Sequence, residues 1–591
     1  MCGFVGFTNK INDASIVLGK MMDRIKHRGP DSDGKYVDEQ IAMGFRRLSI
    51  IDLSDQGSQP IFNEDKSLVL TFNGEIYNYK DLREELVAYG HKFYTQTDSE
   101  VLIHGYEQWG EDMLDKLRGM FAFVIFNKNT NEVFGARDFF GIKPLYYAKM
   151  GETLMWGSEI KSFLDHPHFK KELNTDVLET YLTFQYSPTT ETFFKNVYKL
   201  PAAHCFTYKN GEMNVRRYWE VKFHADNGPA LEDWVNRISD TFKNSVEVHK
   251  FADVEVGSFL SSGVDSSYVA AVANVDKTFT VGFGEDEKYN EIGYAKEFSK
   301  YIHKENFSKV ISPEEYWNSL SKIQYHMDEP LADPAAVALF FVCQIASEKV
   351  KAVLSGEGAD EIFGGYNIYH NPADMASYFK IPRPIRKAVG AVAEKLPHKH
   401  GINYLIRGSK DLDERFIGNA YIFSEKERKD ILSIKTNAPD AMAITKPFYD
   451  KVRDQDQVTQ MQYIDLHLWM TGDILLKADK MSMAHSLELR VPFLDRKVME
   501  LAEQIPVKDR VTETETKYAM RLAALQACPP QTAKKKKLGF PVPIRVWLKE
   551  DKYYNIVKDK FTSPQSAQFF HTDKLVPVSY THLRAHETEL H

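Results

Sequence analysis

The stretch from Val254 to Asn274 constrains the fold more tightly than any other part of this chain. It begins as an apolar, strand-forming run, continues with the small residues of Ser261 to Ser267 (SSGVDSS) and ends in an Ala- and Val-rich segment typical of a helix. Further apolar strands are predicted at Thr278 to Phe283 and at Lys351 to Leu354, with long helical stretches between and after them. Because strands and helices alternate, this part of the chain is expected to form a parallel α/β sheet.

The loop between the first of these strands and its helix is suited to bind phosphate. Backbone N–H groups at a helix N-terminus and the neighbouring Ser hydroxyls bind phosphate oxygens, and Gly263 lets the chain approach closely. Asp265 would repel phosphate unless a cation such as Mg²⁺ lies between them. A second phosphate-loop candidate, Gly29 to Tyr36, matches GxxxxGK but ends in Tyr36 instead of Ser or Thr, and no strand precedes it.

The first 200 residues have a different secondary-structure pattern. Short strand-like runs at Leu68 to Phe72, Phe121 to Phe126 and Glu132 to Ala136 are separated by Gly, Asn and Asp turns, which predicts a domain built on sheets. A chain of 591 residues exceeds the size of one hydrophobic core. We therefore expect a first domain over residues 1–210 and a second over 211–578.

The charge and the cysteine content limit which binding partners and which cellular location are expected for this protein. The net charge of −8 gives no general attraction for nucleic acid or for anionic membranes. The four cysteines form no CxxC pair, so neither a disulfide framework nor a zinc site of that kind is indicated, and the N-terminus lacks the pattern of a signal peptide. The sequence predicts a cytoplasmic protein without nucleic-acid or membrane partners.

Two further segments can be interpreted from composition alone. The apolar run from Ala335 to Ala346 is too short to cross a bilayer and predicts a buried helix, with Asp333 as its N-cap and Pro334 in its first turn. Residues 579–591 contain three histidines in a polar stretch without apolar periodicity. We expect this tail to be disordered or not native to the protein, although metal binding is an alternative.

Cys2 is the candidate nucleophile of the first domain. Removal of Met1 before Cys2-Gly3 would place a thiol and a free α-amine on one residue. An α-amine has a pKa of about 7.7–8.0, so it can accept the thiol proton near neutral pH and serve as the base for its own nucleophile. A cysteine at position 2 is common by chance, so the rest of the domain has to support the interpretation.

Six motifs in succession provide that support. Together they closely resemble the class II glutamine amidotransferases, whose domain is an N-terminal-nucleophile αββα sandwich. The motifs are Met1 to Phe7 (MCGFVGF), Arg28 to Gly34 (RGPDSDG), Arg47 to Asp52 (RLSIID), Asn73 to Asn78 (NGEIYN), Leu117 to Phe123 (LRGMFAF) and Arg137 to Pro144 (RDFFGIKP).

The resemblance implies roles for single residues of this domain. It makes Cys2 the nucleophile, places Asn73 and Gly74 at the oxyanion, and assigns glutamine binding to Arg47, Glu75 and Asp98. These roles are chemically sensible, because a side-chain amide and an exposed N–H after a strand can face a developing oxyanion. An Arg can hold the substrate carboxylate while two carboxylates hold its ammonium group. The alternative for Asn73-Gly74 is an ordinary hairpin turn.

The second half resembles the asparagine synthetases, in the strings Leu354 to Tyr366 (LSGEGADEIFGGY) and Leu475 to Asp495 (LLKADKMSMAHSLELRVPFLD). The resemblance implies an ATP-pyrophosphatase domain, similar to the adenine nucleotide α-hydrolases, in which Ser262 replaces a common Gly of the SGGxDS loop. It implies that Asp265 and Asp360 ligate Mg²⁺, that Glu357 lies near an aspartyl-adenylate and that Lys517 (in KYAMR) faces the reacting phosphorus. ATP or pyrophosphate would contact Ser261, Gly263, Asp265, Ser266, Ser267, Ser355 and Gly356. Lys537 to Pro541 (KLGFP) also looks similar to the family.

The resemblance implies an asparagine synthesis in two steps that use glutamine, aspartate and ATP. Glutamine is hydrolysed at Cys2, and the ammonia travels along a sheltered apolar path to an aspartyl-adenylate, which releases AMP. Three alternatives remain open at this point: amidation of a peptide or sugar-linked carboxylate, a β-lactam synthetase-like enzyme, and a catalytically idle regulatory homologue. Cys2 argues against the second, and Cys2 with Asp265 and Asp360 argues against the third. The residues do not indicate the oligomeric state, for which a homodimer is the candidate.

Overall fold

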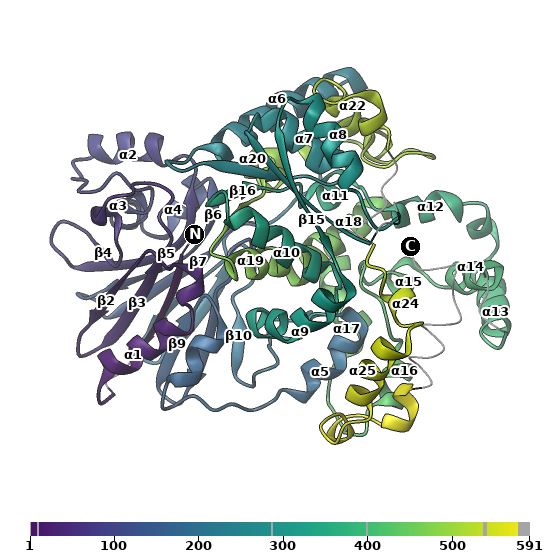
Figure 1. The fold of residues 1–591 in the computed structure, drawn as a ribbon, viewed down its shortest axis with the longest axis horizontal. Helices are drawn as coiled ribbons and strands as arrows, with labels where there is room; N and C mark the ends of the chain where they lie inside the picture. The colour runs from purple at the N-terminus through teal and green to yellow at the C-terminus, as the bar shows by residue number, and fades with distance from the viewer. Residues whose placement is uncertain are drawn as a thin grey trace.

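The structure is a computed structural model that describes residues 2–8, 11–284, 286, 288–396, 400–535 and 541–576. Figure 1 shows a first domain in purple and blue at the left and a second in teal, green and yellow at the right. Three predictions fall outside the described residues: the removal of Met1, most of the KLGFP string and the tail 579–591. Among the described residues, no helix combines the length and the apolar character that a membrane crossing requires.

The first domain contains two antiparallel six-stranded sheets. Sheet A has the order β10-β8-β9-β1-β3-β2 and sheet B has the order β12-β11-β7-β6-β5-β4. The strands of sheet A are β1 (Gly3–Thr8), β2 (Ser32–Val37), β3 (Ile41–Arg47), β8 (Tyr146–Met150), β9 (Thr153–Gly157) and β10 (Val197–Lys199). Those of sheet B are β4 (Ile61–Phe62), β5 (Leu68–Ile76), β6 (Gly119–Asn127), β7 (Glu132–Arg137), β11 (His204–Lys209) and β12 (Glu212–Arg217).

Alternating side chains stack these sheets into four layers. In β6, Ala122 and Val124 point into the core between the sheets, whereas Phe121 and Phe123 point to the opposite face of sheet B. Successive residues of a strand face opposite sides, so a strand that is apolar at every position must be covered on both faces. Helix α1 (Ala14–Asp23) covers sheet A, and α2 (Tyr79–Ala88) and α3 (Glu100–Trp109) cover sheet B. The predicted αββα sandwich is confirmed.

The second domain contains the expected parallel sheet. Its order is β15-β14-β13-β16-β17, formed by β13 (Val256–Phe259), β14 (Lys277–Phe283), β15 (Glu305–Ile311), β16 (Ala352–Leu354) and β17 (Glu488–Arg490). Sequential strands run outward from β13 in one direction up to β15, and the chain then returns to the other side of β13 as β16. Ligands bind at such a switch point, at the carboxyl ends of the two strands where the order reverses.

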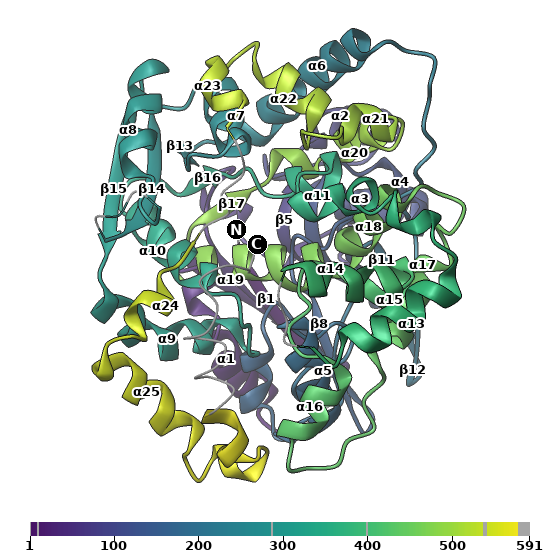
Figure 2. The same ribbon diagram turned by 90° about the vertical axis from the view of Figure 1, so that its right-hand side faces the viewer.

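Helices surround this sheet. Figure 2 shows α24 and α25 beside α9. The Trp317 ring of α9 and the Tyr553 ring of α25 stack with their centroids 5.9 Å apart. The helices next to the sheet are α6 (Leu231–Lys250), α7 (Val264–Ala273), α8 (Ile292–Tyr301), α9 (Pro313–Met327), α10 (Ala335–Ser347), α11 (Ala359–Phe363), α18 (Gln457–His467), α19 (Leu475–Met483), α20 (Arg496–Ala502) and α22 (Tyr518–Ala524). The others are α4 (Met113–Lys116), α5 (Thr175–Phe184), α12 (Asn371–Asp374), α13 (Arg383–Ala393), α14 (His400–Ser409), α15 (Leu412–Arg415), α16 (Glu425–Ile431), α17 (Ala441–Tyr449), α21 (Val507–Arg510), α23 (Pro530–Ala533), α24 (Ile544–Trp547) and α25 (Asp551–Phe561).

Two boundaries differ from the sequence predictions. The hairpin β11–β12 pairs through to Arg217, so the domain division we propose lies after Arg217 and before α6, a few residues beyond 210. The N-cap of α10 is Pro334 and not Asp333. Asp333 still accepts the Ala335 N–H at 2.9 Å, and its second carboxylate oxygen bonds to Lys477, which anchors the helix start to α19.

Candidate functional site

Cys2 lies where the first strand of sheet A meets sheet B. Its backbone N donates to Oδ1 of Asn73 at 3.0 Å, and its carbonyl accepts Nε of Arg28 at 3.1 Å. The thiol borders a small cavity, and burial raises the pKa of the Cys2 thiol above its ordinary value. A thiol in this setting needs a neighbouring base before it can act as a nucleophile at neutral pH.

Asn73 and Gly74 stand beside this thiol in the middle of β5. The Asn73 side chain is fully buried, and its Nδ2 has no hydrogen-bond partner among the described residues. An orphaned buried donor is costly, which points to a ligand oxygen as its missing acceptor. A Cβ on Gly74 would lie 2.0 Å from the Met120 carbonyl of β6, so only glycine fits at this point of the sheet.

The same cavity gathers the predicted charged residues. Arg47, Glu75 and Asp98 all border it. Arg47 donates to the carbonyls of Ser54, at 2.6 Å, and of Asp52, so its guanidinium is fixed at the cavity wall. Burial raises the pKa of Asp98 to about 7, and burial together with Glu488 raises the pKa of Glu75 well above its ordinary value. The cavity therefore contains carboxyl groups that a bound cation would stabilise in their charged form.

The second domain completes this cavity, which the sequence did not predict. Glu488 of β17 borders the cavity beside Cys2, and Arg490 of the same strand pairs with Glu75 at 3.0 Å. Although burial opposes it, Arg490 holds the pKa of Glu488 at about 2. Only alternate residues of a strand face one side, and here two charged residues at positions i and i+2 project from β17 into the first domain.

A further buried ion pair joins the two domains behind Cys2. The guanidinium of Arg28 donates to both carboxylate oxygens of Asp479, at 2.8 and 3.1 Å, and one of its nitrogens also reaches Glu159 at 2.9 Å. Because Arg28 holds the Cys2 carbonyl as well, helix α19 is tied directly to the nucleophile strand. Bidentate, fully desolvated pairs of this kind fix relative orientation.

The second predicted site lies at the switch point of the parallel sheet. A cavity of about 210 Å³ opens at the carboxyl ends of β13 and β16. Of the predicted residues, it is bordered by Ser261, Asp265, Ser266, Ser355, Gly356, Glu357 and Asp360. A Cβ on Gly356 would lie 2.8 Å from the Ser266 N, so glycine is required for the two loops to approach each other.

Lys517 contacts two acidic residues of this cavity without bordering the cavity itself. Its ammonium group bonds to both carboxylate oxygens of Asp265, each at 2.7 Å, and to Asp360 at 2.8 Å. The lysine side chain is 1% exposed, so a cationic centre is buried between the two aspartates predicted to ligate Mg²⁺. The two carboxylates therefore converge on one point.

Three predicted residues of this site, Lys517, Gly263 and Ser267, do not border the cavity, whereas one charged residue that borders it was not predicted. Gly263 is the N-cap of α7, and Ser267 is fully buried behind the loop. Lys477 of α19 does border it, held at 2.6 Å by both Asp333 and Asp473. Charged residues among the apolar ones of α19 were the available sequence signal, because a buried charge requires partners.

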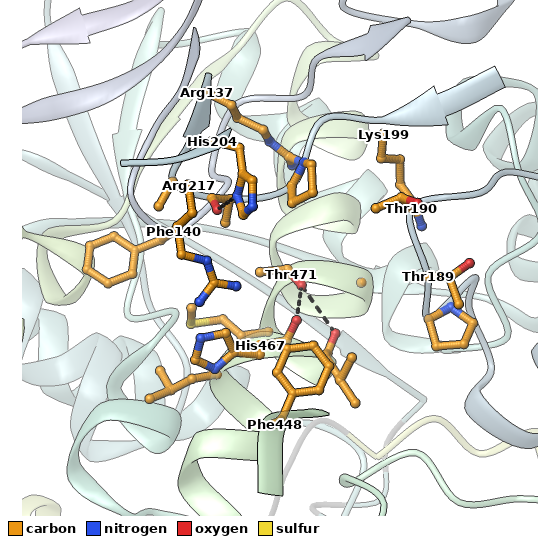
Figure 3. Close-up of a pocket in the computed structure, with 18 of the residues that line it drawn as sticks. Arg137, Phe140, Thr189, Thr190, Lys199, His204, Arg217, Phe448, His467 and Thr471 are labelled. Carbon is orange, nitrogen blue, oxygen red and sulfur yellow. Dashed lines mark hydrogen bonds between the residues drawn. The ribbon is translucent and has the colours of Figure 1, made fainter. Parts of the chain in front are cut away.

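A larger cavity, of about 500 Å³, lies between the domains and contains none of the predicted residues. Figure 3 shows side chains from the first domain, among them Arg137, Lys199 and His204, facing Phe448, His467 and Thr471 of the second. Its cationic groups are already bonded, since Arg137 donates to three backbone carbonyls and Lys199 to that of Ser187.

Comparisons with known proteins agree with this division into two sites. Residues 1–219 match the family described as "Glutamine amidotransferase domain", and residues 237–589 match the family described as "Asparagine synthase". The chain is 43% identical to asparagine synthetase [glutamine-hydrolyzing] 1 of Bacillus subtilis, over 98% of this chain and 93% of that protein. It is 40% identical to a putative asparagine synthetase [glutamine-hydrolyzing] of Mycobacterium tuberculosis, over 93% of this chain and 88% of that protein.

Proposed function

Because the chain belongs to the family of glutamine-hydrolysing asparagine synthetases, we propose that the Cys2 cavity is its glutaminase site and the cavity at β13 and β16 its synthetase site. The activity is that of an ATP-using ligase that makes asparagine from aspartate with nitrogen from glutamine. The observation that carries the assignment of the first site is the Cys2–Asn73 hydrogen bond, which leaves the Asn73 Nδ2 unpartnered beside the thiol.

In the glutaminase site the Cys2 sulfur attacks the side-chain amide carbon of glutamine. The α-amine of Cys2, once Met1 is removed, takes the thiol proton and passes it to the departing ammonia. Asn73 Nδ2 and the Gly74 N–H stabilise the oxyanion of the tetrahedral intermediate. Water then hydrolyses the thioester, which releases glutamate and restores the thiol.

The charged residues of this site hold the substrate at its two polar ends. Arg47 binds the α-carboxylate, and Glu75 and Asp98 bind the α-ammonium. The support for the second role is that the carboxyl groups of Glu75, Asp98 and Glu488 all border this cavity.

This arrangement predicts a pH-dependent affinity for glutamine. Below its pKa of about 7, Asp98 is protonated and no longer attracts the ammonium group. We expect the KM for glutamine to rise as the pH falls from about 8 to about 6, because the raised pKa places the loss of charge in this window. The kcat should fall over the same range as the α-amine of Cys2 is protonated, so the two constants have to be separated. Initial rates of glutamate release across this range measure both constants.

Asp98→Asn provides the control for this prediction. The variant should raise KM by about tenfold, the equivalent of one charged hydrogen bond, and should flatten its pH dependence. Asp81→Asn, on the exposed face of α2, should behave like wild type. A KM for wild type that is constant across the range would rule out Asp98 as the ammonium ligand.

In the synthetase site we assign the two facing loops to ATP. Ser261 and Ser266 from the first loop, with Ser355 and Gly356 from the second, bind phosphate oxygens, and Gly263 and Ser267 shape the first loop from behind. Glu357 borders the same cavity and lies next to the aspartyl-adenylate. The position at the switch point of a parallel sheet supports this assignment.

Mg²⁺ fits the donor set of this site. Asp265 and Asp360 offer carboxylate oxygens, the ligands that Mg²⁺ prefers, and they already converge on one cation, the Lys517 ammonium. When bound, the ion would neutralise phosphate charge next to these aspartates. Lys517 adds a fixed positive charge that stabilises the negative charge at the reacting phosphorus.

Ammonia would travel between the two sites through the apolar core. One continuous hydrophobic cluster includes Leu48 and Ile50, which border the Cys2 cavity, and Phe259 and Leu260, which border the ATP cavity. An apolar route keeps ammonia from being protonated by bulk water. Assembly as a homodimer and a cytoplasmic location stay predictions.

The reaction products test the assignment of the second site. Because its loops resemble a pyrophosphate-binding pair and no GxxxxGK[ST] sequence occurs in the chain, each asparagine should be accompanied by one AMP and one pyrophosphate. Chromatographic separation of nucleotides after turnover, with a coupled assay for pyrophosphate, gives both quantities. ADP and inorganic phosphate as primary products would contradict it.

A further inference from the structure

Two histidines and two glutamates come together on the helical side of sheet B. Glu64 follows β4, His91 follows α2, and His104 and Glu107 lie on one face of α3. One ligand atom of each side chain lies within 4.8 Å of all the others. We call these four residues the His–Glu cluster; they do not border either of the two cavities assigned above.

The spacing inside the His–Glu cluster is too long for hydrogen bonds and suits a shared metal ion. The Nδ1 of His104 lies 3.4 Å from Glu64 and 3.8 Å from Glu107. The Nδ1 of His91 lies 3.7 Å from Glu64 and 3.6 Å from Glu107. Four ligands at about 2.0–2.1 Å around a tetrahedral zinc ion are separated from each other by about 3.3 Å. All four observed separations lie slightly above that value, so small side-chain movements would close the tetrahedron.

His104 provides an independent indication of a missing ligand. Its side chain is 0% exposed, and neither ring nitrogen has a hydrogen-bond partner among the described residues. A buried imidazole normally bonds through at least one nitrogen, since an unpaired buried polar group is costly. Its Nδ1 faces the carboxylates of Glu64 and Glu107, which together with His91 surround the same point.

Neighbouring residues hold the two imidazoles as metal sites require. The Nε2 of His104 points toward Glu100 at 3.5 Å, and Glu100 is itself fixed by the N–H groups of Tyr94 and Thr95 at 2.7 and 2.8 Å. The Nε2 of His91 lies 3.1 Å from the side-chain oxygen of Gln108. Because the Nε2 of His91 donates its proton to this oxygen, Nδ1 of His91 is the unprotonated nitrogen and can bind a metal.

The two carboxylates are also anchored from outside the cluster. Glu64 accepts the Lys92 N–H at 2.8 Å, and Glu107 accepts the side-chain amide of Asn63 at 3.3 Å. Two fixed imidazoles and two fixed carboxylates form a set that divalent zinc and similar transition ions bind, whereas Mg²⁺ prefers oxygen ligands alone.

We propose that Glu64, His91, His104 and Glu107 bind one zinc or similar divalent transition-metal ion. Its place in the fold indicates a structural role. His91 begins, and His104 follows, the segment that carries Asp98 into the glutaminase cavity. A metal bound here would tie that segment to α3 and stabilise the first domain.

Metal content and a cobalt spectrum test this proposal. The full-length protein is stripped with a chelator, loaded with ZnCl₂ and passed through gel filtration, and its zinc is measured per chain. Wild type should retain one zinc more than the double variant His91→Gln/Glu107→Gln. Zinc should raise the melting temperature of wild type but not that of this double variant. Loading with Co²⁺ should give the visible absorption of a tetrahedral site without a sulfur charge-transfer band, which excludes Cys2 as the ligand.

The control pair is His224→Gln/Glu85→Gln, which removes the same residue types from exposed or half-exposed positions. These variants should retain zinc as wild type does, and the histidines of the C-terminal tail are present in every protein compared. Equal zinc in wild type and His91→Gln/Glu107→Gln, both folded by circular dichroism, would overturn the proposal and leave the cluster as ion pairs between protonated histidines and glutamates. If the double variant does not fold, the single variant Glu107→Gln is used instead, because Glu107 is the exposed ligand. It should weaken the cobalt spectrum, and an unchanged spectrum would overturn the proposal.

Discussion

Replacing Asp265 or Asp360 by Asn should stop asparagine synthesis from either nitrogen source while glutamine hydrolysis continues. Each substitution removes a negative charge from the point where the two carboxylates and Lys517 meet, and neither residue belongs to the Cys2 cavity. Losing one preorganised charged contact at a reacting centre costs on the order of 10²–10³ in rate, and loss of Mg²⁺ binding would add to this.

The two activities have to be measured separately on the same preparations. Asparagine is measured with ammonium salt as the nitrogen source, which bypasses Cys2, and glutamate release is measured with glutamine alone. Asp276→Asn is a matched control, because this aspartate lies in the same domain with a side chain that is 83% exposed. Equal loss of both activities in a folded Asp265→Asn protein would contradict the assignment of these residues to one site only.

The sheets could be predicted because their residues follow a simple pattern. In β6 every position from Met120 to Phe126 is apolar, because both faces of sheet B are covered, so the run stands out from the polar turns around it. The strand β17 carried no such signal, since it has three residues, two of them charged. Its place beside β16 depends on contacts across more than a hundred residues of chain, which local patterns cannot show.

The same limit explains which site residues were missed. Cys2, Asn73 and Asp265 belong to short motifs whose chemistry is local, and each lies at its predicted cavity or next to it. Arg490 and Lys477 act on sites formed mainly by other segments, so their roles follow only from tertiary structure. The usable signal was the mixture of charged and apolar residues from Leu475 to Asp495, because a charge in a protein core has to be paired.

Residues of both domains form the Cys2 cavity and fix its side chains. Arg490 pairs with Glu75, and Asp479 pairs with Arg28, which holds the Cys2 carbonyl. The second domain therefore fixes both Glu75, which we propose to bind the substrate ammonium group, and the backbone of Cys2, the proposed nucleophile. Helix α19 also carries Lys477 to the cavity at β13 and β16, so this one helix contacts both candidate sites.

The largest effect is expected for Cys2→Ala. Without the thiol no thioester can form, and removal of a nucleophile has cost on the order of 10⁶ in rate where it has been dissected in a protease, so glutamine-dependent synthesis should disappear. The synthetase cavity does not contain Cys2, so added ammonium salt should restore asparagine formation to the level that wild type reaches with ammonium. Rescue should strengthen as the pH rises, because more of the added nitrogen is then free ammonia.

Cys205→Ala is the matched control for this experiment, since it removes a buried thiol from sheet B, away from the cavity. It should keep glutamine-dependent synthesis. Asparagine is quantified for wild type and both variants with each nitrogen source, and melting curves establish that all three proteins are folded. Glutamine use by Cys2→Ala at the wild-type rate would exclude Cys2 as the nucleophile. Failure of ammonium to rescue a folded Cys2→Ala protein would instead show that the synthetase site depends on the thiol.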